Sequence, residues 1–230
     1  MSDDTARRSV RSFVLRAGRI TVAQTRALEH LWPVWGVEPG NAAVDWNAVF
    51  ARDTAKTLEI GFGNGEALLE LAAKAPDSDF IGVDVHPPGV GHLLAGIERL
   101  GLTNVRVLRG DAIGFLKTAF TPESLDRILV WFPDPWPKKR HHKRRLVTAE
   151  FLELVASRLK PGGILHLATD WQDYAEHMLD ALDRHMAFEN SAGPGAYSAR
   201  PDWRPATKFE QRGLRLGHGV WDLIARRRHN

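Results

Sequence analysis

Apolar residues recur along this chain with two alternating spacings from about residue 56 onward. Short apolar runs are typical of buried strands, and they alternate with stretches in which apolar residues return every three or four positions, as on one helix face. The runs predict strands at residues 57–60, 80–85, 105–108, 126–132, 164–169 and 220–225. The helical spacing predicts helices at residues 66–74, 90–100, 111–117, 145–160 and 171–185.

This alternation predicts an α/β fold of the Rossmann-like kind, in which a mostly parallel sheet carries helices on both faces. We assign residues 36–230 to this one domain and residues 1–35 to a basic N-terminal arm, where Trp32-Pro33 breaks any helix. Ligands of such sheets bind beyond the carboxyl ends of the strands. Polar residues that directly follow a predicted strand are therefore the first candidates for a functional site.

The formal net charge is only +3, but the basic residues gather in three segments. They are the first thirty residues, residues 138–145 and residues 226–228. Any one such segment is commonly a solvated surface. Three of them on a chain that is otherwise near neutral indicate a polyanionic partner.

The absence of cysteine excludes disulfides, thiolate metal sites and cysteine nucleophiles, and it suits a reducing cytoplasm. No segment has the apolar length of a membrane span, and no apolar stretch follows the N-terminal arginines as in a secretory signal. The ten histidines show no metal-ligand spacing with acidic residues, so we predict no metal and no membrane. The sequence does not determine the oligomeric state.

A glycine-rich segment, Glu59-Ile-Gly61-Phe-Gly63-Asn-Gly65, follows the first predicted strand and opens a helix. Glycines let the backbone turn tightly and approach a ligand closely. The spacing differs from the dinucleotide pattern, and the carboxylates of Glu59 and Glu66 would repel a phosphate. They suit S-adenosylmethionine, which has no phosphate and carries a cationic amine and a sulfonium. The alternative is a glycine turn that merely joins strand to helix.

Acidic residues also follow the second and third predicted strands. Asp84 ends the second strand, where a carboxylate can accept hydrogen bonds from ribose hydroxyls. Asp111 follows the third strand, within reach of an adenine edge, and the N-cap of the next helix is its alternative role. Three acids after three successive strands indicate a nucleoside site more strongly than any one of them.

Five segments of the sequence together resemble the bacterial tRNA (guanine-N7-)-methyltransferase family, in order and over nearly the whole chain. They are Arg11-Ser12-Phe13-Val14, Leu58-Glu59-Ile60-Gly61-Phe62-Gly63, His86-Pro87-Pro88-Gly89-Val90-Gly91, Phe132-Pro133-Asp134-Pro135-Trp136-Pro137-Lys138-Lys139 and Thr207-Lys208-Phe209-Glu210. The glycine segment alone is shared by many methyltransferases. The segments around Asp134 and Thr207 are specific.

The resemblance implies a class I S-adenosylmethionine-dependent methyltransferase fold, with S-adenosylmethionine as cofactor and tRNA as partner, in the cytoplasm. By position it implies cofactor contacts from Glu59, Gly61, Gly63, Asp84, Asp111 and Asp134, the last of which is also the catalytic candidate. It implies substrate contacts from Lys138, Asp170, Thr207, Lys208, Phe209 and Glu210. It implies RNA contacts from Arg140, His141, His142, Lys143, Arg144 and Arg145. The family often has glutamate where Asp84 stands, and the carboxylate is kept. A target guanine in the tRNA variable loop is likewise implied by the resemblance alone.

Guanine N7 has a free lone pair, so its methylation needs orientation more than a general base. A fixed carboxylate on the Watson–Crick edge would orient the base and oppose the positive charge that develops on it. Asp134 after the fourth strand is the best candidate and Asp170 after the fifth is the second. Their alternatives are a turn residue between prolines and the N-cap of the next helix. Residues 207–210 also fit a helix capping box.

Three other classes of protein compete with this interpretation. An adenine-N6 methyltransferase has an Asp/Asn-Pro-Pro-aromatic motif after its fourth strand, but the proline and the aromatic residue are transposed in Asp134-Pro135-Trp136-Pro137. An RNA-binding protein on a decayed methyltransferase fold would have lost the acids at the strand ends, which are all present. A nicotinamide-dependent oxidoreductase requires a different glycine spacing.

Overall fold

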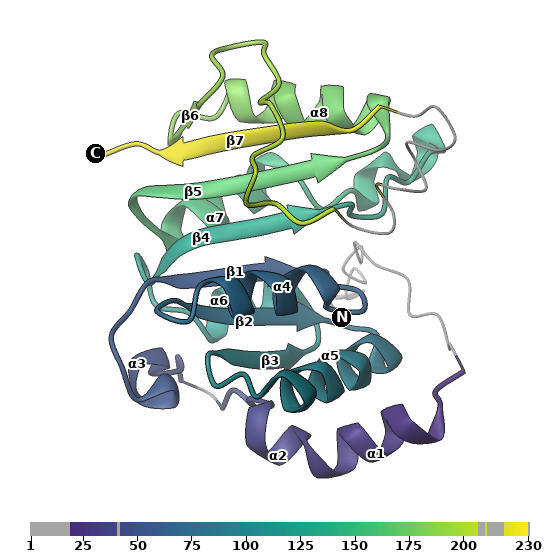
Figure 1. Ribbon diagram of the computed structural model, residues 1–230. Coiled ribbons are helices and arrows are strands. Elements are labelled where there is room, and N and C mark those ends of the chain that lie inside the picture. Colours follow the sequence, from purple (N-terminus) through teal and green to yellow (C-terminus); the bar gives the residue numbers. More distant parts are fainter. Residues whose placement is uncertain (1–18, 41, 207–209, 211–218, 230) are drawn as a thin grey trace, which may run out of the picture.

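The computed structural model describes residues 19–40, 42–206, 210 and 219–229. Within them, seven strands form one sheet in the order β3-β2-β1-β4-β5-β7-β6. The strands are β1 (Lys56–Ile60), β2 (Asp79–Asp84), β3 (Val105–Arg109), β4 (Leu125–Trp131), β5 (Leu159–Thr169), β6 (Phe188–Asn190) and β7 (Trp221–Arg227). The first five run parallel, and β7 runs antiparallel to both β5 and β6 (Figure 1). The order reverses between β1 and β4, and this switch point opens a crevice at the carboxyl ends of the strands.

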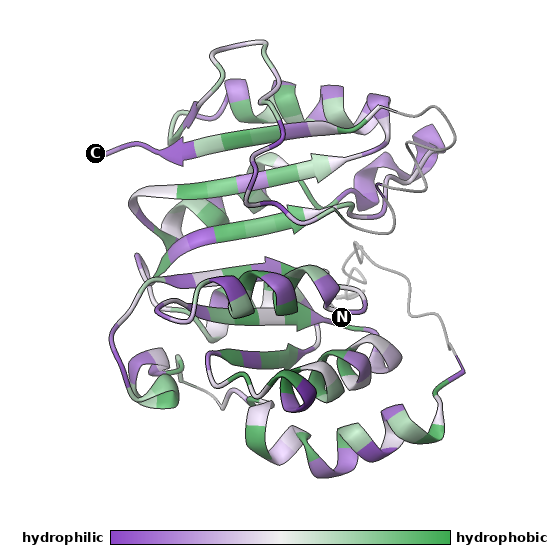
Figure 2. Ribbon diagram, viewed as in Figure 1, coloured by the Kyte–Doolittle hydropathy of each residue, from purple (hydrophilic) through white to green (hydrophobic). Residues whose placement is uncertain are grey.

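Helices cover both faces of the sheet and enclose two hydrophobic clusters (Figure 1). One face carries α4 (Glu66–Lys74) and α5 (Pro87–Leu100), whose buried residues pack with Leu129 and Trp131 of β4. The other face carries α3 (Trp46–Phe50), α6 (Ala112–Thr118), α7 (Ala149–Arg158) and α8 (Gln172–Asp183). Figure 2 shows the central strands as mainly hydrophobic ribbons, as expected for a sheet that is buried on both faces.

The predicted strands all form, with bounds that differ by a few residues, and so do the predicted helices. The helix predicted at residues 145–160 begins late, because the side chain of Thr148 caps α7 by accepting a hydrogen bond from the amide of Phe151. Residues ahead of it form a separate 3-10 helix, η1 (Lys139–Arg144). The short elements α3 and β6 were not predicted.

The N-terminal segment differs from the prediction in one respect. Residues 22–35 are helical, forming α1 (Val22–His30) and α2 (Trp32–Trp35), so the expectation that Trp32-Pro33 excludes a helix was wrong. Pro33 stands in the first turn of α2, where the missing N–H costs nothing. A capping box of Thr21 and Gln24 begins α1, and Ala27 of α1 is buried. The division into an arm and a domain at residue 35 stays a prediction.

The basic segment at residues 138–145 and the one at residues 226–228 lie at different places on the fold. The 3-10 helix η1 follows β4 and forms a hydrophilic segment at the carboxyl ends of the strands (Figure 2). Arg226 and Arg227 end β7 and Arg228 follows it, so the three lie at the opposite end of the strands, because β7 is antiparallel to β5. Arg227 there donates a hydrogen bond to Glu123. The C-terminal arginines therefore do not extend the basic surface of η1.

Candidate active site

The glycine segment forms a tight loop between β1 and α4. Gly61, Gly63 and Gly65 all have positive φ angles, of 77°, 59° and 78°, which residues with a Cβ rarely adopt. The Gly63 amide donates a hydrogen bond of 2.8 Å to Oδ2 of Asp84, and the His86 amide donates one of 2.9 Å to Oδ1. Asp84 therefore fixes the loop from the end of the neighbouring strand β2.

The first turn of α5 supports the same loop from behind. A Cβ at Gly89 would lie 2.0 Å from the carbonyl oxygen of Gly63, so only glycine allows this approach. Two residues further on, a Cβ at Gly91 would lie 2.7 Å from the carbonyl oxygen of Gln24 in α1. The glycines of the His86–Gly91 segment thus allow α5 to contact the glycine loop on one side and α1 on another.

A pocket of about 350 Å³ lies at the carboxyl ends of β1, β2, β3 and β4. Asp84, Asp111 and Asp134 line it together with Gly61 and Gly63. The structure thus brings together five of the six predicted cofactor residues. Asp111 is also the N-cap of α6, with its carboxylate accepting hydrogen bonds of 3.3 Å from the amides of Ile113 and Gly114. Capping leaves acceptor capacity on both oxygens, so the two roles of Asp111 are compatible.

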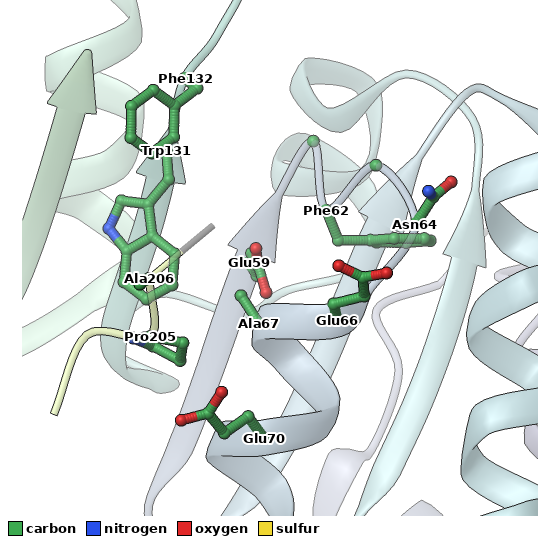
Figure 3. Close-up of a pocket in the computed structure, with 12 residues that line it drawn as sticks. Glu59, Phe62, Asn64, Glu66, Ala67, Glu70, Trp131, Phe132, Pro205 and Ala206 are labelled. Atoms are coloured by element: carbon green, nitrogen blue, oxygen red, sulfur yellow. The ribbon is translucent and has the colours of Figure 1, made fainter. Parts of the chain in front are cut away.

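Glu59, the sixth predicted cofactor residue, lines an adjoining pocket that shares Gly61, Gly63 and Phe132 with the first. Figure 3 shows its side chain between the end of β1 and the first turn of α4. The residue is only 4% exposed, and its Oε2 atom has no hydrogen-bond partner within the described part of the chain. Burial, and then the charge of Asp84, raises the pKa of this carboxyl to about 8. A buried carboxylate oxygen without a partner fits a cationic ligand group such as the amine of S-adenosylmethionine.

Asp134 lies in the segment that follows β4, and it is exposed on the wall of the larger pocket. The backbone around it is strained, because Phe132 and Trp136 have φ angles of 53° and 46°. These are two of the four non-glycine residues with positive φ in the described ranges. Such strain persists only where surrounding contacts hold it, and it clusters at functional sites. A simple turn between prolines does not account for it.

The basic segment after Asp134 presents an exposed cationic surface. Lys138, Lys139, Arg140 and Lys143 are exposed, and His141 and His142 are half-buried. The guanidinium of Arg144 lies over the ring of Trp136, 4.9 Å from its centroid. Because Arg144 already covers one face of Trp136, that face is not open for a base to stack on it.

Arg145 differs in its surroundings from the other residues of the segment that we predicted to contact RNA. Its side chain is 2% exposed, and its guanidinium is bonded within the protein. Nε donates a hydrogen bond of 3.1 Å to the carbonyl oxygen of Pro135, and Nη2 forms an ion pair with Asp173 of α8. The pKa of Asp173 is lowered first by its hydrogen bond from Arg145. Burial thus separates Arg145 from the exposed members of the segment.

Asp170 follows β5 but lies apart from Asp134. It lines a different, open pocket with Trp171, Asp173 and Trp221. The N-cap of α8 is Trp171, with no side-chain capping bond, so the alternative role of Asp170 as N-cap was wrong. The two acidic residues that we predicted to contact guanine therefore stand on neighbouring loops and line separate pockets.

Thr207, Lys208 and Phe209 lie outside the described residues. The capping box predicted at residues 207–210 therefore stays a prediction. Glu210 is buried, and both of its carboxylate oxygens accept hydrogen bonds from Arg204, at 2.9 and 2.8 Å. Arg204 also donates one of 3.0 Å to Asp222 of β7, whose other oxygen lies 2.7 Å from Nε2 of His166 in β5. Burial lowers the pKa of His166, although its hydrogen bond with Asp222 acts in the opposite direction.

This buried network and the contacts of Arg145 were not predicted from the sequence. One signal was available, because His166 and Asp222 are polar residues within otherwise apolar strands. Arg204 gave no such signal, since it stands in a long polar segment. Its burial depends on pairing across the fold and not on its neighbours in sequence.

Solved structures with a similar fold define the class. The 16S rRNA methyltransferase KamB superposes with a TM-score of 0.59 at 15% identity, over 81% of this chain and 95% of that one. The precorrin-6y C5,15-methyltransferase from Geobacter metallireducens has a TM-score of 0.52 at 15% identity, over 83% of this chain and 93% of that one. At these identities the likeness shows the fold alone. With the strand order and the loop after β1, it shows the class I S-adenosylmethionine-dependent methyltransferase fold, which confirms the predicted fold class.

Sequence comparison identifies the family. A family model described as "Putative methyltransferase" matches residues 53–223. The tRNA (guanine-N(7)-)-methyltransferase of Methylococcus capsulatus is 58% identical over 99% of this chain and 97% of its own length. That of Pseudomonas aeruginosa is 56% identical over 94% of this chain and 88% of its own. The chain belongs to the tRNA (guanine-N7-)-methyltransferase family, as its motifs predicted.

Membership of this family also confirms S-adenosylmethionine as the cofactor, whereas the roles of the individual site residues stay predictions. Within the described ranges, no group of three or more His, Asp or Glu side chains is arranged to hold a metal ion. None of the helices there combines the length and the apolar character that a membrane span requires.

Proposed function

We propose that this enzyme transfers a methyl group from S-adenosylmethionine to N7 of a guanine in tRNA, with Asp134 as its catalytic residue. The observation that carries the proposal is the convergence of Asp84, Asp111 and Asp134 on one pocket beside the glycine loop. Membership of the family supports the reaction, and the acidic residues of the pocket support the site proposed for it.

The donor set of the two adjoining pockets fits the cofactor. Glu59 would hold the amine, because its buried Oε2 lacks a partner within the described part. Asp84 would accept hydrogen bonds from the ribose hydroxyls while it holds the loop, and Asp111 would face the adenine edge. S-adenosylmethionine supplies an electrophilic methyl group on a sulfonium, and guanine N7 supplies the lone pair that attacks it. The protein therefore needs no nucleophile of its own.

The protein must then orient guanine and oppose the charge that develops on it. Asp134 is exposed in the pocket, and its strained flanking backbone restricts where its carboxylate can lie. A carboxylate on the Watson–Crick edge of guanine would favour the cationic product over the neutral base. Asp170, which lines a separate pocket after the neighbouring strand β5, would contact the same nucleotide or the one beside it.

Substrate RNA would lie across the exposed basic segment after Asp134. Lys138, Arg140, Lys143 and Arg144 would contact phosphates, with His141 and His142 between them. The location of the guanine in the variable loop, the cytoplasmic location, and the substrate roles of Thr207, Lys208, Phe209 and Glu210 rest on the family resemblance.

The test is a methyl-transfer assay with labelled cofactor on tRNA that lacks N7 methylation, followed by nucleoside digestion. The expected product is 7-methylguanosine, and N6-methyladenosine would refute the reaction. Asp134→Asn keeps the shape and loses the charge, so we expect its single-turnover rate to fall roughly 10²–10³-fold with both ligands saturating. If Asp134→Asn methylates at the normal rate, the catalytic role passes to Asp170, and Asp170→Asn is the variant that must then fail.

A further inference from the structure

We propose that Arg145 is a positioning residue, which holds the Asp134 loop against the start of α8 and thereby sets Asp134 for methyl transfer. This inference rests on the role of Asp134 proposed above. It departs from the prediction that Arg145 contacts RNA along with its neighbours.

The contacts of Arg145 join two loops that follow neighbouring strands. Its Nε donates to the carbonyl oxygen of Pro135, the residue directly after Asp134. Its Nη2 pairs with Asp173, which stands in the first turn of α8, three residues after Asp170. One guanidinium therefore joins the loop that carries Asp134 to the helix that begins beside Asp170.

Further contacts fix the guanidinium itself. Its Cζ lies 4.9 Å from the ring centroid of Tyr174, and Nη2 lies 3.2 Å from Nε2 of His142. The hydroxyl of Tyr174 accepts a hydrogen bond from the amide of Val147, two residues after Arg145. Planar stacking together with a fork of donors is what arginine provides and lysine does not.

The strained backbone beside Asp134 explains why such a contact is needed. Phe132 and Trp136 hold left-handed φ angles on either side of it, a conformation that relaxes unless other contacts oppose the relaxation. Pro135 lies between them, and its carbonyl oxygen is the atom that Arg145 holds. The 2% exposure of Arg145 also leaves its charge out of reach of a phosphate in this structure.

Arg145→Lys tests the proposal because it keeps the charge and loses the stacking and the forked geometry. We expect its single-turnover rate with both ligands saturating to fall roughly 10- to 100-fold, as for a displaced catalytic group. We expect S-adenosylmethionine affinity and the salt dependence of tRNA binding to stay unchanged. The matched control is Arg184→Lys, in the exposed Arg184–Asp180 pair at the other end of α8, which should behave as the unaltered protein.

Asp173→Asn approaches the same contact from an exposed side chain and keeps an amide oxygen that can accept a hydrogen bond from Arg145, so it should disturb folding less than changes at the buried Arg145 itself. It should lower the same rate, and adding Arg145→Lys should lower it by less than the product of the two separate effects. A normal saturating rate in both single variants overturns the proposal. The proposal is also overturned if the slope of log tRNA affinity against log salt falls by about 0.7–0.9 in Arg145→Gln. A fall of that size means that one phosphate is no longer neutralised, so Arg145 would contact RNA. Asp134→Asn in the same assay tests the proposed function separately.

Discussion

The buried acidic side chains on the two sides of the switch point between β1 and β4 differ in their bonding partners. On the cofactor side, Glu59 is buried with one oxygen that has no hydrogen-bond partner within the described part of the chain. On the other side, Glu210 and Asp222 are equally buried, but both are bonded to Arg204. Burying a charge is unfavourable unless it is paired, so an arrangement without a partner suggests a group reserved for a ligand.

The two sides of the site are also built from different parts of the chain. The cofactor side is built from backbone: glycines with positive φ, loop amides on Asp84, and close approach at Gly89. The substrate side is built from side chains, with Arg145 and Arg204 as two buried hubs. A backbone-built site depends on local sequence, whereas a site built from paired side chains depends on the whole fold.

The largest effect is expected from removing the hub of the paired side. Arg204→Gln leaves the carboxylates of Glu210 and Asp222 buried without their cation, and this should lower the free energy of unfolding by about 3–5 kcal/mol. Denaturant titration measures it. Arg200→Gln is the control, because Arg200 contacts the same Glu210 at 3.3 Å from an exposed position and should cost at most about 1 kcal/mol.

Glu59→Gln in the same titration sharpens the contrast. It replaces a buried carboxyl that has no partner cation in the described structure by a neutral amide of the same shape, so the free energy of unfolding should stay the same or rise. A loss as large as that of Arg204→Gln would show that Glu59 is a structural residue, and the contrast between the two sides would then be wrong.

The same contrast explains what the sequence could predict. Gly61, Gly63, Asp84 and Asp111 could be predicted because each lies in a short stretch where a strand ends and a turn or helix begins. That local pattern is visible in the sequence around each residue. Arg145 and Asp173 are 28 residues apart, and nothing in either neighbourhood indicates that they pair. Arg145 therefore looked like its exposed neighbours. The helices at residues 22–35 were missed because they are held by packing against a distant part of the chain, through apolar residues such as Ala27 and Leu31 and through the close approach at Gly91.

The second prediction concerns the charge of Glu59 itself. At pH 7 a carboxyl with a pKa of about 8 is mainly protonated, and the amine of the cofactor is mainly charged. Pairing them ionises Glu59, so binding should release close to one proton, and affinity should rise as the pH increases toward 8. Calorimetry at pH 7 in buffers of different ionisation enthalpy measures the release.

Glu59→Gln is the control for that measurement. It should release no proton and should bind the cofactor more weakly by about 1.5–3 kcal/mol, the contribution of a hydrogen bond to a charged group. Heats of binding that do not depend on the buffer in the unaltered protein would contradict the assignment of Glu59 to the amine.

The third prediction tests whether the cofactor side depends on backbone approach. In Gly89→Ala the new Cβ would lie 2.0 Å from the carbonyl oxygen of Gly63, so α5 or the loop must shift. Overpacking of this kind costs about 1–3 kcal/mol, which should appear mainly as weaker cofactor binding because the loop moves. Gly40→Ala, at a position with open space, is the control. Unchanged cofactor affinity in Gly89→Ala would show that α5 yields and the loop does not.

The smallest effect is expected at the exposed basic surface, where side chains act singly. Arg140→Ala with Lys143→Ala should flatten the slope of log affinity for tRNA against log salt by about 0.7–0.9 for each phosphate that is no longer neutralised. Turnover at saturating tRNA should change little, in contrast to Arg145→Lys. The matched control is Arg226→Ala with Arg228→Ala. It removes the same charge at the opposite end of the strands, away from the basic segment after Asp134. Equal flattening in both double variants would mean that tRNA responds to total charge, and the basic segment after Asp134 would lose its assignment as the RNA surface.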